Sequence, residues 1–233
     1  MEKNKFDGFI NRYSLGGEIE SVIIKAEDTT LSVKMISDDK TLLGSVEMSN
    51  PGFPDGSFGV YTTSLLKQLL SVLDSSITIE EAPGSLKFFD KGTKVNYMLA
   101  AESVIPKVPP TKNLPEFDVE VSLNSDFINK FVKSTAVLVE STTFTFLSKG
   151  GASEVILGYS TDANSNRISI DVDANVPGDV KPISFSSKYL KNILTANKEA
   201  NNATLKISTK GLANVKFDEG DYKSEYYLVE VKK

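Results

Sequence analysis

A ten-residue segment occurs twice in this chain, 124 positions apart. Residues 61–70 read YTTSLLKQLL and residues 185–194 read FSSKYLKNIL, so an aromatic residue, a hydroxyl pair, a lysine and the apolar positions coincide. Strand-like stretches follow both copies, at residues 77–80 and 205–208. The spacing is longer than that of a solenoid repeat, which indicates a duplicated domain.

Prolines separate the two copies. Four of the nine prolines, Pro106, Pro109, Pro110 and Pro115, lie within ten residues. Proline fixes its own φ and disfavours helix in the residue before it, so this stretch predicts a stiff, extended connector. We therefore expect an N-terminal domain of residues 1–105, a connector of residues 106–116 and a C-terminal domain of residues 117–233, with both domains of ordinary size.

Composition narrows the possible chemistry. The chain has no cysteine and no histidine, which excludes thiolate nucleophiles, imidazole bases, disulfides and Cys/His zinc sites. With 40% hydrophobic and 24% charged residues it resembles an ordinary globular protein. We find neither a signal sequence nor an apolar run long enough for a membrane span, and expect a cytoplasmic protein (host cytoplasm if viral) without cofactor, metal or membrane partner.

Helical and strand periodicities alternate along the chain. Apolar stripes at helical spacing predict short helices within residues 3–15, 63–74, 125–137 and 187–198. Hydroxyl and amide side chains suited to N-caps precede the last three. Strands are predicted at residues 18–26, 30–37, 42–49, 77–80, 85–89, 94–102, 117–123, 142–148, 154–160, 167–173, 205–208, 213–218 and 222–231. The order predicts an α+β fold of two duplicated domains, each with two short helices on one side of antiparallel sheets.

Positive charge is concentrated in the predicted helices. The four helical spans contain nine basic and three acidic residues, a net charge of +6, which leaves −11 for the rest of a chain whose formal charge is −5. The basic residues are Lys3, Lys5, Arg12, Lys67, Lys130, Lys133, Lys188, Lys191 and Lys198. Lysine is a good helix former, and one such helix would need no explanation beyond a solvated face. Four in an acidic protein favour a bound polyanion whose phosphates, not base edges, are contacted.

Two similar halves, paired helices, antiparallel sheets, a proline-rich connector and basic helices together resemble DNA polymerase sliding clamps of the proliferating cell nuclear antigen type. Size and short lysine-bearing helices look most like the trimeric clamp of tailed bacteriophages, and Tyr226-Tyr227-Leu228-Val229 is similar to that family's tyrosine-rich last strand. The resemblance implies a homotrimeric ring that encircles double-stranded DNA, with helices inside and sheets outside. It implies no catalytic activity; the ring would be a processivity factor for a replicative polymerase.

The resemblance also implies two kinds of protein contact. Ring closure would join the edges of residues 94–102 and 167–173 from neighbouring subunits, through Val95, Tyr97, Leu99, Ile168, Ile170 and Val172. Peptides of the polymerase and clamp loader would bind an apolar pocket drawn from Leu42, Leu43, Val108, Leu114, Leu212, Tyr227 and Val229. These leucines and tyrosines also suit a plain core.

Two other classes of protein fit parts of the pattern. A β-rich viral tail or capsid protein would explain the strands, but not the helical lysines in both halves. A hydrolase would use Asp162, Asp171 or Asp173, yet no nucleophile elbow or phosphate-binding loop accompanies them. We interpret Asp171 and Asp173 as charges that protect a strand edge.

Overall fold

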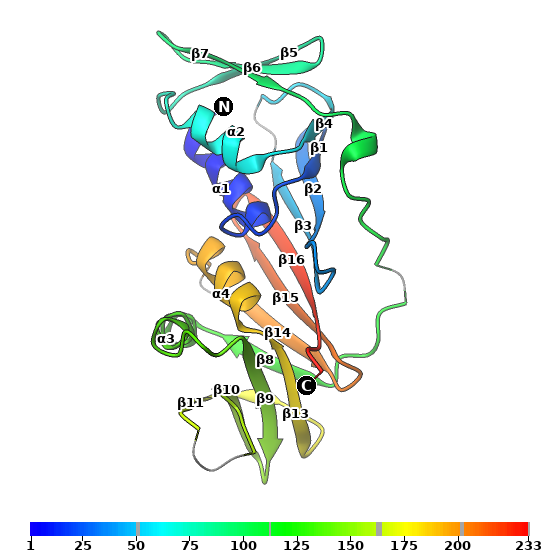
Figure 1. The fold of residues 1–233 in the computed structure, drawn as a ribbon, viewed down its shortest axis with the longest axis vertical. Helices are drawn as coiled ribbons and strands as arrows, with labels where there is room; N and C mark the ends of the chain where they lie inside the picture. Colours follow the sequence, from blue (N-terminus) through cyan, green and yellow to red (C-terminus); the bar gives the residue numbers. More distant parts are fainter. Residues whose placement is uncertain (50–51, 112, 162–164, 201–202, 233) are drawn as a thin grey trace. The chain divides into compact units, whose positions relative to one another are not determined.

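The chain folds into two units, shown in Figure 1. The structure is a computed structural model that describes residues 1–49, 52–111, 113–161, 165–200 and 203–232. Unit 1 comprises Met1–Pro109 with Glu219–Ser224, and unit 2 comprises Pro110–Asp218 with Glu225–Lys233. The main division falls between Pro109 and Pro110, within the stretch expected to be the connector. None of the described helices is long and apolar enough to cross a membrane.

Unit 1 contains two helices and seven strands in its first 98 residues. In chain order these are α1 (Lys3–Ser14), β1 (Val22–Glu27), β2 (Thr30–Ile36), β3 (Leu42–Ser49), β4 (Gly56–Val60), α2 (Thr63–Leu70), β5 (Thr78–Ala82), β6 (Ser85–Phe89) and β7 (Lys94–Met98), followed by the 3-10 turn η1 (Glu102–Val104). The strands pair antiparallel in the orders β4-β1-β2-β3 and β5-β6-β7.

Unit 2 repeats this arrangement with two added strands among the described residues, one before its first helix and a two-residue strand that pairs with it. Its elements are β8 (Val119–Leu123), α3 (Ser125–Val137), β9 (Thr143–Lys149), β10 (Ala152–Leu157), β11 (Ile168–Asp171), β12 (Ala174–Asn175), β13 (Val180–Ser186), α4 (Ser187–Ala196), β14 (Ala203–Ser208), β15 (Leu212–Glu219) and β16 (Tyr222–Val229). One sheet has the order β11-β10-β9-β13, and the other contains β12-β8-β14-β15-β16. The turn of the β15–β16 hairpin belongs to unit 1, where the Ser49 amide donates to the Asp221 carbonyl.

The sheet orders of the two units correspond strand by strand. The order β4-β1-β2-β3 matches β13-β9-β10-β11, and β5-β6-β7 matches β14-β15-β16. Even β8 has a counterpart, a single bridge between Glu2 and Ser76 in unit 1. The predicted α+β class with antiparallel sheets is confirmed, and the topology repeats as the sequence repeat indicated.

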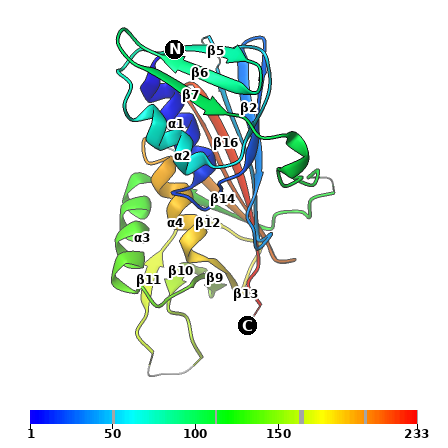
Figure 2. The ribbon, with the colours of Figure 1, turned by 45° about the horizontal axis from the view of Figure 1, so that its top comes forward.

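The two helices of each unit lie side by side on one face of its sheets (Figure 2). In unit 1, α1 buries Phe6, Phe9 and Tyr13 completely. The Phe6 ring lies 6.1 Å from Phe88 of β6. In unit 2, the Phe131 ring of α3 meets Phe144 of β9 edge-on, at 5.7 Å. Each such buried ring contributes about 1.5–3 kcal/mol through removal of apolar surface from water.

The helices begin where the sequence places N-cap residues. Asn124 Oδ1 accepts a hydrogen bond from the Phe127 amide at 2.9 Å, and Ser186 Oγ accepts one from the Tyr189 amide at 3.3 Å. Thr62 precedes α2 without a side-chain cap bond. There Glu20 replaces the cap, because its carboxylate accepts from the Ser64 amide and its carbonyl accepts from Thr63.

Candidate nucleic-acid interface

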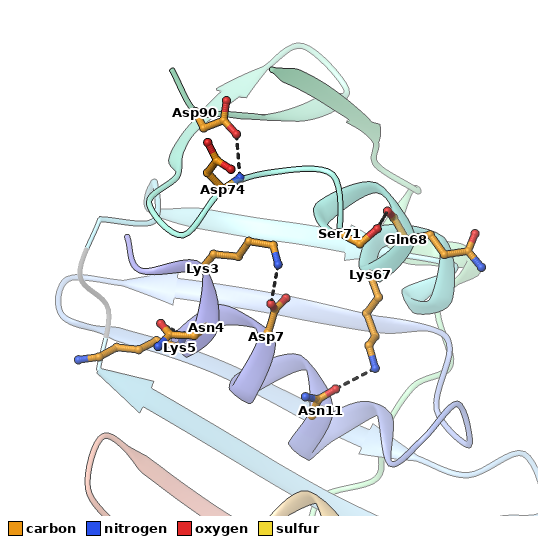
Figure 3. A network of polar contacts seen from close by, with 10 residues as sticks. All are labelled: Lys3, Asn4, Lys5, Asp7, Asn11, Lys67, Gln68, Ser71, Asp74 and Asp90. Atoms are coloured by element: carbon orange, nitrogen blue, oxygen red, sulfur yellow. Dashed lines mark hydrogen bonds and ion pairs between the residues drawn. The ribbon is translucent and has the colours of Figure 1, made fainter. Parts of the chain in front are cut away.

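The cations of α1 and α2 are held by polar neighbours within unit 1 (Figure 3). Lys3 Nζ lies 2.9 Å from the Asp7 carboxylate one turn along α1, and the Lys3 side chain is only 18% exposed. Lys67 reaches from α2 to α1 and donates to Asn11 Oδ1 at 2.8 Å. Both ammonium groups therefore have a protein partner that a phosphate would have to replace.

The turn of the β15–β16 hairpin supplies partners for the rest of α1. Asp221 lies 2.7 Å from Lys5 Nζ and raises the pKa of Lys5 through a hydrogen bond and charge attraction. Tyr222 Oη donates to the Lys5 carbonyl at 2.8 Å. Lys5, one of the three cations of α1, is thus paired with an acid more than 200 positions away in the sequence.

Arg12 is buried, contrary to the prediction that it lies on the exposed face of its helix. Its side chain is 9% exposed, its Nη1 donates to the Gly8 carbonyl at 3.0 Å, and its guanidinium carbon lies 3.8 Å from the centre of the Tyr222 ring. This is a cation–π contact that stabilises the hairpin turn on α1. Helical spacing alone could not reveal it, because the covering residue comes from the far end of the chain.

The cations of α3 and α4 are more accessible. Lys130 pairs with Asp126 at 2.7 Å, but both side chains are largely exposed, at 59% and 71%. Lys133 and Lys188 are exposed, and Lys191 is partly exposed. Among the described residues, no ion pair involves Lys133 or Lys191.

Lys198 was expected on the same helical face as Lys188 and Lys191, and this prediction is wrong. Helix α4 ends at Ala196 with Asn197 as its C-cap, so Lys198 lies beyond the helix. Asn197 Nδ2 donates to the Ile193 carbonyl at 2.9 Å and to Tyr226 Oη at 3.1 Å, which fixes the end of α4 on β16. Lys198 is exposed in the segment that follows.

Two strands expected at subunit contacts, β7 and β11, are outermost in their sheets as the structure describes them. The chosen side chains mostly point inward: Val95 and Tyr97 are buried in unit 1, and Ile170 is 8% exposed in unit 2. Leu99 and Val172 lie just outside the strands. Ile168 is partly exposed. The outward positions Lys94, Asn96 and Met98 were missed, although strict alternation along the strand identifies them.

The residues expected to bind partner peptides differ widely in exposure. Leu42 is completely buried in β3 and Tyr227 is 9% exposed, whereas Leu114 and Val229 are 41% and 40% exposed. Leu43, Val108 and Leu212 are intermediate. Tyr227 Oη donates to Glu225 Oε1 at 2.9 Å, and burial together with this carboxylate raises the pKa of Tyr227 to about 12. Leu42 is therefore a core residue, and Leu114 and Val229 are the apolar groups a partner reaches first.

The carboxylates of the alternative hydrolase prediction form no cluster in the described part of the chain. Asp171 and Asp173 are exposed, and Asp162 lies outside the described residues. No group of three or more acidic side chains arranged to hold a metal ion occurs among the residues that the structure describes.

No family model matches the sequence, and no curated protein matches it. The fold does match a solved structure, the crystal structure of Proliferating Cellular Nuclear Antigen from Entamoeba histolytica. The TM-score is 0.73 at 15% sequence identity, and the alignment covers 99% of this chain and 96% of that chain. At this identity the likeness shows the fold, which is that of the proliferating cell nuclear antigen type of clamp.

Proposed function

We propose that this chain, which has the clamp fold over nearly its whole length, is the subunit of a sliding clamp. Three copies would form a ring around duplex DNA, with no catalytic activity, and tether a replicative polymerase. The observation that carries the proposal is the duplicated pair of helices on one face of duplicated sheets, combined with a structural match covering 99% of the chain.

The distribution of charge supports DNA as the ligand. The helical spans hold a net charge of +6 in a chain of −5. Exposed lysines on α3 and α4 can contact phosphates without reading bases, because a lysine ammonium binds a phosphate as a point charge. Retention by encirclement needs only weak phosphate contacts, and weak contacts permit sliding.

Protein partners would bind through the apolar groups that remain accessible. We assign the contact with polymerase and clamp-loader peptides to the accessible apolar residues Leu114 and Val229 of unit 2, together with the less exposed Leu212 and Tyr227. Leu114 is 41% and Val229 40% exposed, so an apolar peptide side chain gains burial there.

Two measurements test the proposal. Light scattering should give a mass of three 25.4 kDa chains at micromolar concentration. Protein threaded onto linear duplex DNA whose ends are then blocked should resist a 0.5 M salt wash, and should be released when the DNA is cut between the blocks. Equal retention on cut and uncut DNA would contradict encirclement, and a monomer at all concentrations would contradict the ring.

A further inference from the structure

Helix α1 carries a polar face beside α2, distinct from its buried apolar face. Lys3, Asp7 and Asn11 follow one another at four-residue spacing, which places them on one side of the helix. Lys67 of α2 reaches the same side, where its ammonium group donates to Asn11 Oδ1 at 2.8 Å (Figure 3). We call these four residues the polar ridge of unit 1. The ridge holds two cations and one acid.

The other two cations of α1 lie on a different side of the helix. The β15–β16 turn covers both, with Asp221 at Lys5 and Tyr222 at Arg12. In Figure 3 the Lys5 side chain extends away from the polar ridge. Because the turn occupies that side, a polyanion that lies across α1 and α2 meets the polar ridge first.

The acid of the ridge stands alone. Among the residues of α1 and α2, all of which the structure describes, Asp7 is the only acidic one. Its carboxylate lies 2.9 Å from Lys3 Nζ, and the Lys3 and Asp7 side chains are 18% and 33% exposed. Lysine is on the N-terminal side of this pair, which is the less favourable order for two charges four residues apart in a helix. A pair of this kind contributes little to folding, so the main effect of Asp7 is on the charge of the ridge.

We propose, resting on the DNA contact of the proposed function, that Asp7 limits the affinity of unit 1 for phosphate. Its carboxylate neutralises Lys3 and repels a phosphate that approaches the ridge. With Asp7 the ridge has a net charge of +1, and without it the net charge would be +2. Weak phosphate contacts let a protein move along DNA, so an acid at this position favours sliding over tight binding.

Asp7→Asn tests the proposal, since it removes the charge and keeps the shape of the side chain. We expect binding to a short fluorescent duplex, followed by anisotropy from about 50 to 200 mM salt, to become at least about threefold tighter at the low-salt end. The slope of log K against log salt concentration should steepen by about 0.9. Thermal unfolding should be nearly unchanged. Equal affinities of Asp7→Asn and the wild type would overturn the proposal.

Two further variants separate the polar ridge from a general effect of charge. Asp221→Asn removes the same charge from the ion pair of Lys5, on the covered side of α1, and should change the affinity by less than about twofold. Asp7→Asn combined with Lys3→Gln should return to within about twofold of the wild type, because the ridge again carries a net charge of +1. An equal gain in Asp221→Asn, or a gain that survives in full without Lys3, would overturn the proposal.

The wild-type measurement distinguishes this proposal from the proposed function. A wild type that binds no duplex even at about 50 mM salt would contradict the DNA contact and the role of Asp7 together. A wild type that binds DNA, with an affinity that Asp7→Asn leaves unchanged, would overturn the role of Asp7 alone.

Discussion

At the scale of single residues, α1 and the β15–β16 turn are fitted so closely that a helix glycine has no room for a methyl group. A Cβ on Gly8 would lie 2.6 Å from Tyr222 Oη and 3.1 Å from Arg12 Nη1. Alanine normally stabilises a helix by about 1 kcal/mol relative to glycine. Here the methyl group would displace the Tyr222 hydroxyl from the Lys5 carbonyl. Glycine preserves this hydrogen bond and the packing of Arg12 on the Tyr222 ring.

We therefore expect Gly8→Ala to destabilise unit 1 by about 1–3 kcal/mol, the usual cost of overpacking, as measured by urea unfolding. Removing the hydroxyl makes room, so in a Tyr222→Phe background the same change should cost at least about 0.5 kcal/mol less. A Gly8→Ala variant more stable than the wild type would show that the turn does not pack on α1 as described.

Asp90 connects two turns of unit 1 through backbone amides. Its carboxylate accepts from the amides of Asp74 at 2.8 Å, Gly92 at 2.9 Å and Thr93 at 2.7 Å, and these bonds lower the pKa of Asp90 (Figure 3 shows the Asp74 contact). A folded-state pKa below the unfolded value gives stability that is present above about pH 4 and is lost as the pH falls through the folded pKa.

Asp90→Asn should accordingly lower Tm by a few degrees at pH 7, and the difference from the wild type should shrink as the pH falls from about 4 to 2. Thermal unfolding followed by circular dichroism measures both. Asp55→Asn, at an exposed acid of the same unit, is the control and should change Tm little. If the Tm of Asp90→Asn differs from that of the wild type by the same amount at pH 7 and at pH 2, the negative charge of Asp90 does not contribute to stability.

At the scale of elements, α2 and α3 start in different ways, and this gives a paired prediction. Asn124→Ala removes the cap bond to Phe127 and should destabilise unit 2 by about 1 kcal/mol. Thr62→Ala should cost less than about 0.3 kcal/mol, because Glu20 already binds the first amides of α2. Urea unfolding distinguishes them, with Asn124→Asp as the variant that keeps the cap. If Asn124→Ala and Thr62→Ala lower the free energy of unfolding equally, Glu20 does not replace the side-chain cap of α2.

Strands with strong alternation were predicted from the sequence almost to the residue, such as β3 and β6. Strands β4 and β13 were missed for a physical reason. Gly56 and Gly59 weaken the strand signal in β4, yet a Cβ on Gly59 would lie 2.2 Å from the Ala100 carbonyl, so the close pairing itself requires glycine. Pro182 lies in β13 where the register shifts between Val180 and Ile183, and an outermost strand tolerates a residue without an amide hydrogen.

The candidate site was predictable only in part, because residues distant in the sequence cover some of the helical cations. The spacing of apolar residues predicts which lysines lie on the helix face opposite the buried apolar residues. Lys130 and Lys133 are exposed, as this spacing predicts. The spacing says nothing about residues that arrive from elsewhere in the chain, and Asp221 and Tyr222 cover Lys5 and Arg12 in that way. Tertiary contacts therefore decide which helical cations remain accessible.

At the scale of the whole molecule, the two units differ in how accessible their helical cations are to a polyanion. The helices themselves carry the same net charge in each unit, +3 for α1 with α2 and +3 for α3 with α4. In unit 1, Lys3 contacts Asp7, Lys5 contacts Asp221 and Lys67 contacts Asn11. A ligand must break these contacts before it binds there, so phosphate contacts should come mainly from α3 and α4.

The salt dependence of DNA binding tests this difference. Each lost phosphate contact makes the slope of log K against log salt concentration shallower by about 0.9 on duplex DNA. Lys133→Gln removes an exposed cation and should reduce the slope by about that amount or more, since a ring presents several copies. Lys3→Gln removes a cation that Asp7 already neutralises, so its slope should stay within error of the wild type. Lys34→Gln is the control, because Lys34 is exposed on β2 between Val33 and Met35, which are buried toward the core. A larger change for Lys3→Gln than for Lys133→Gln would mean that DNA displaces Asp7, and that unit 1 carries the phosphate contacts.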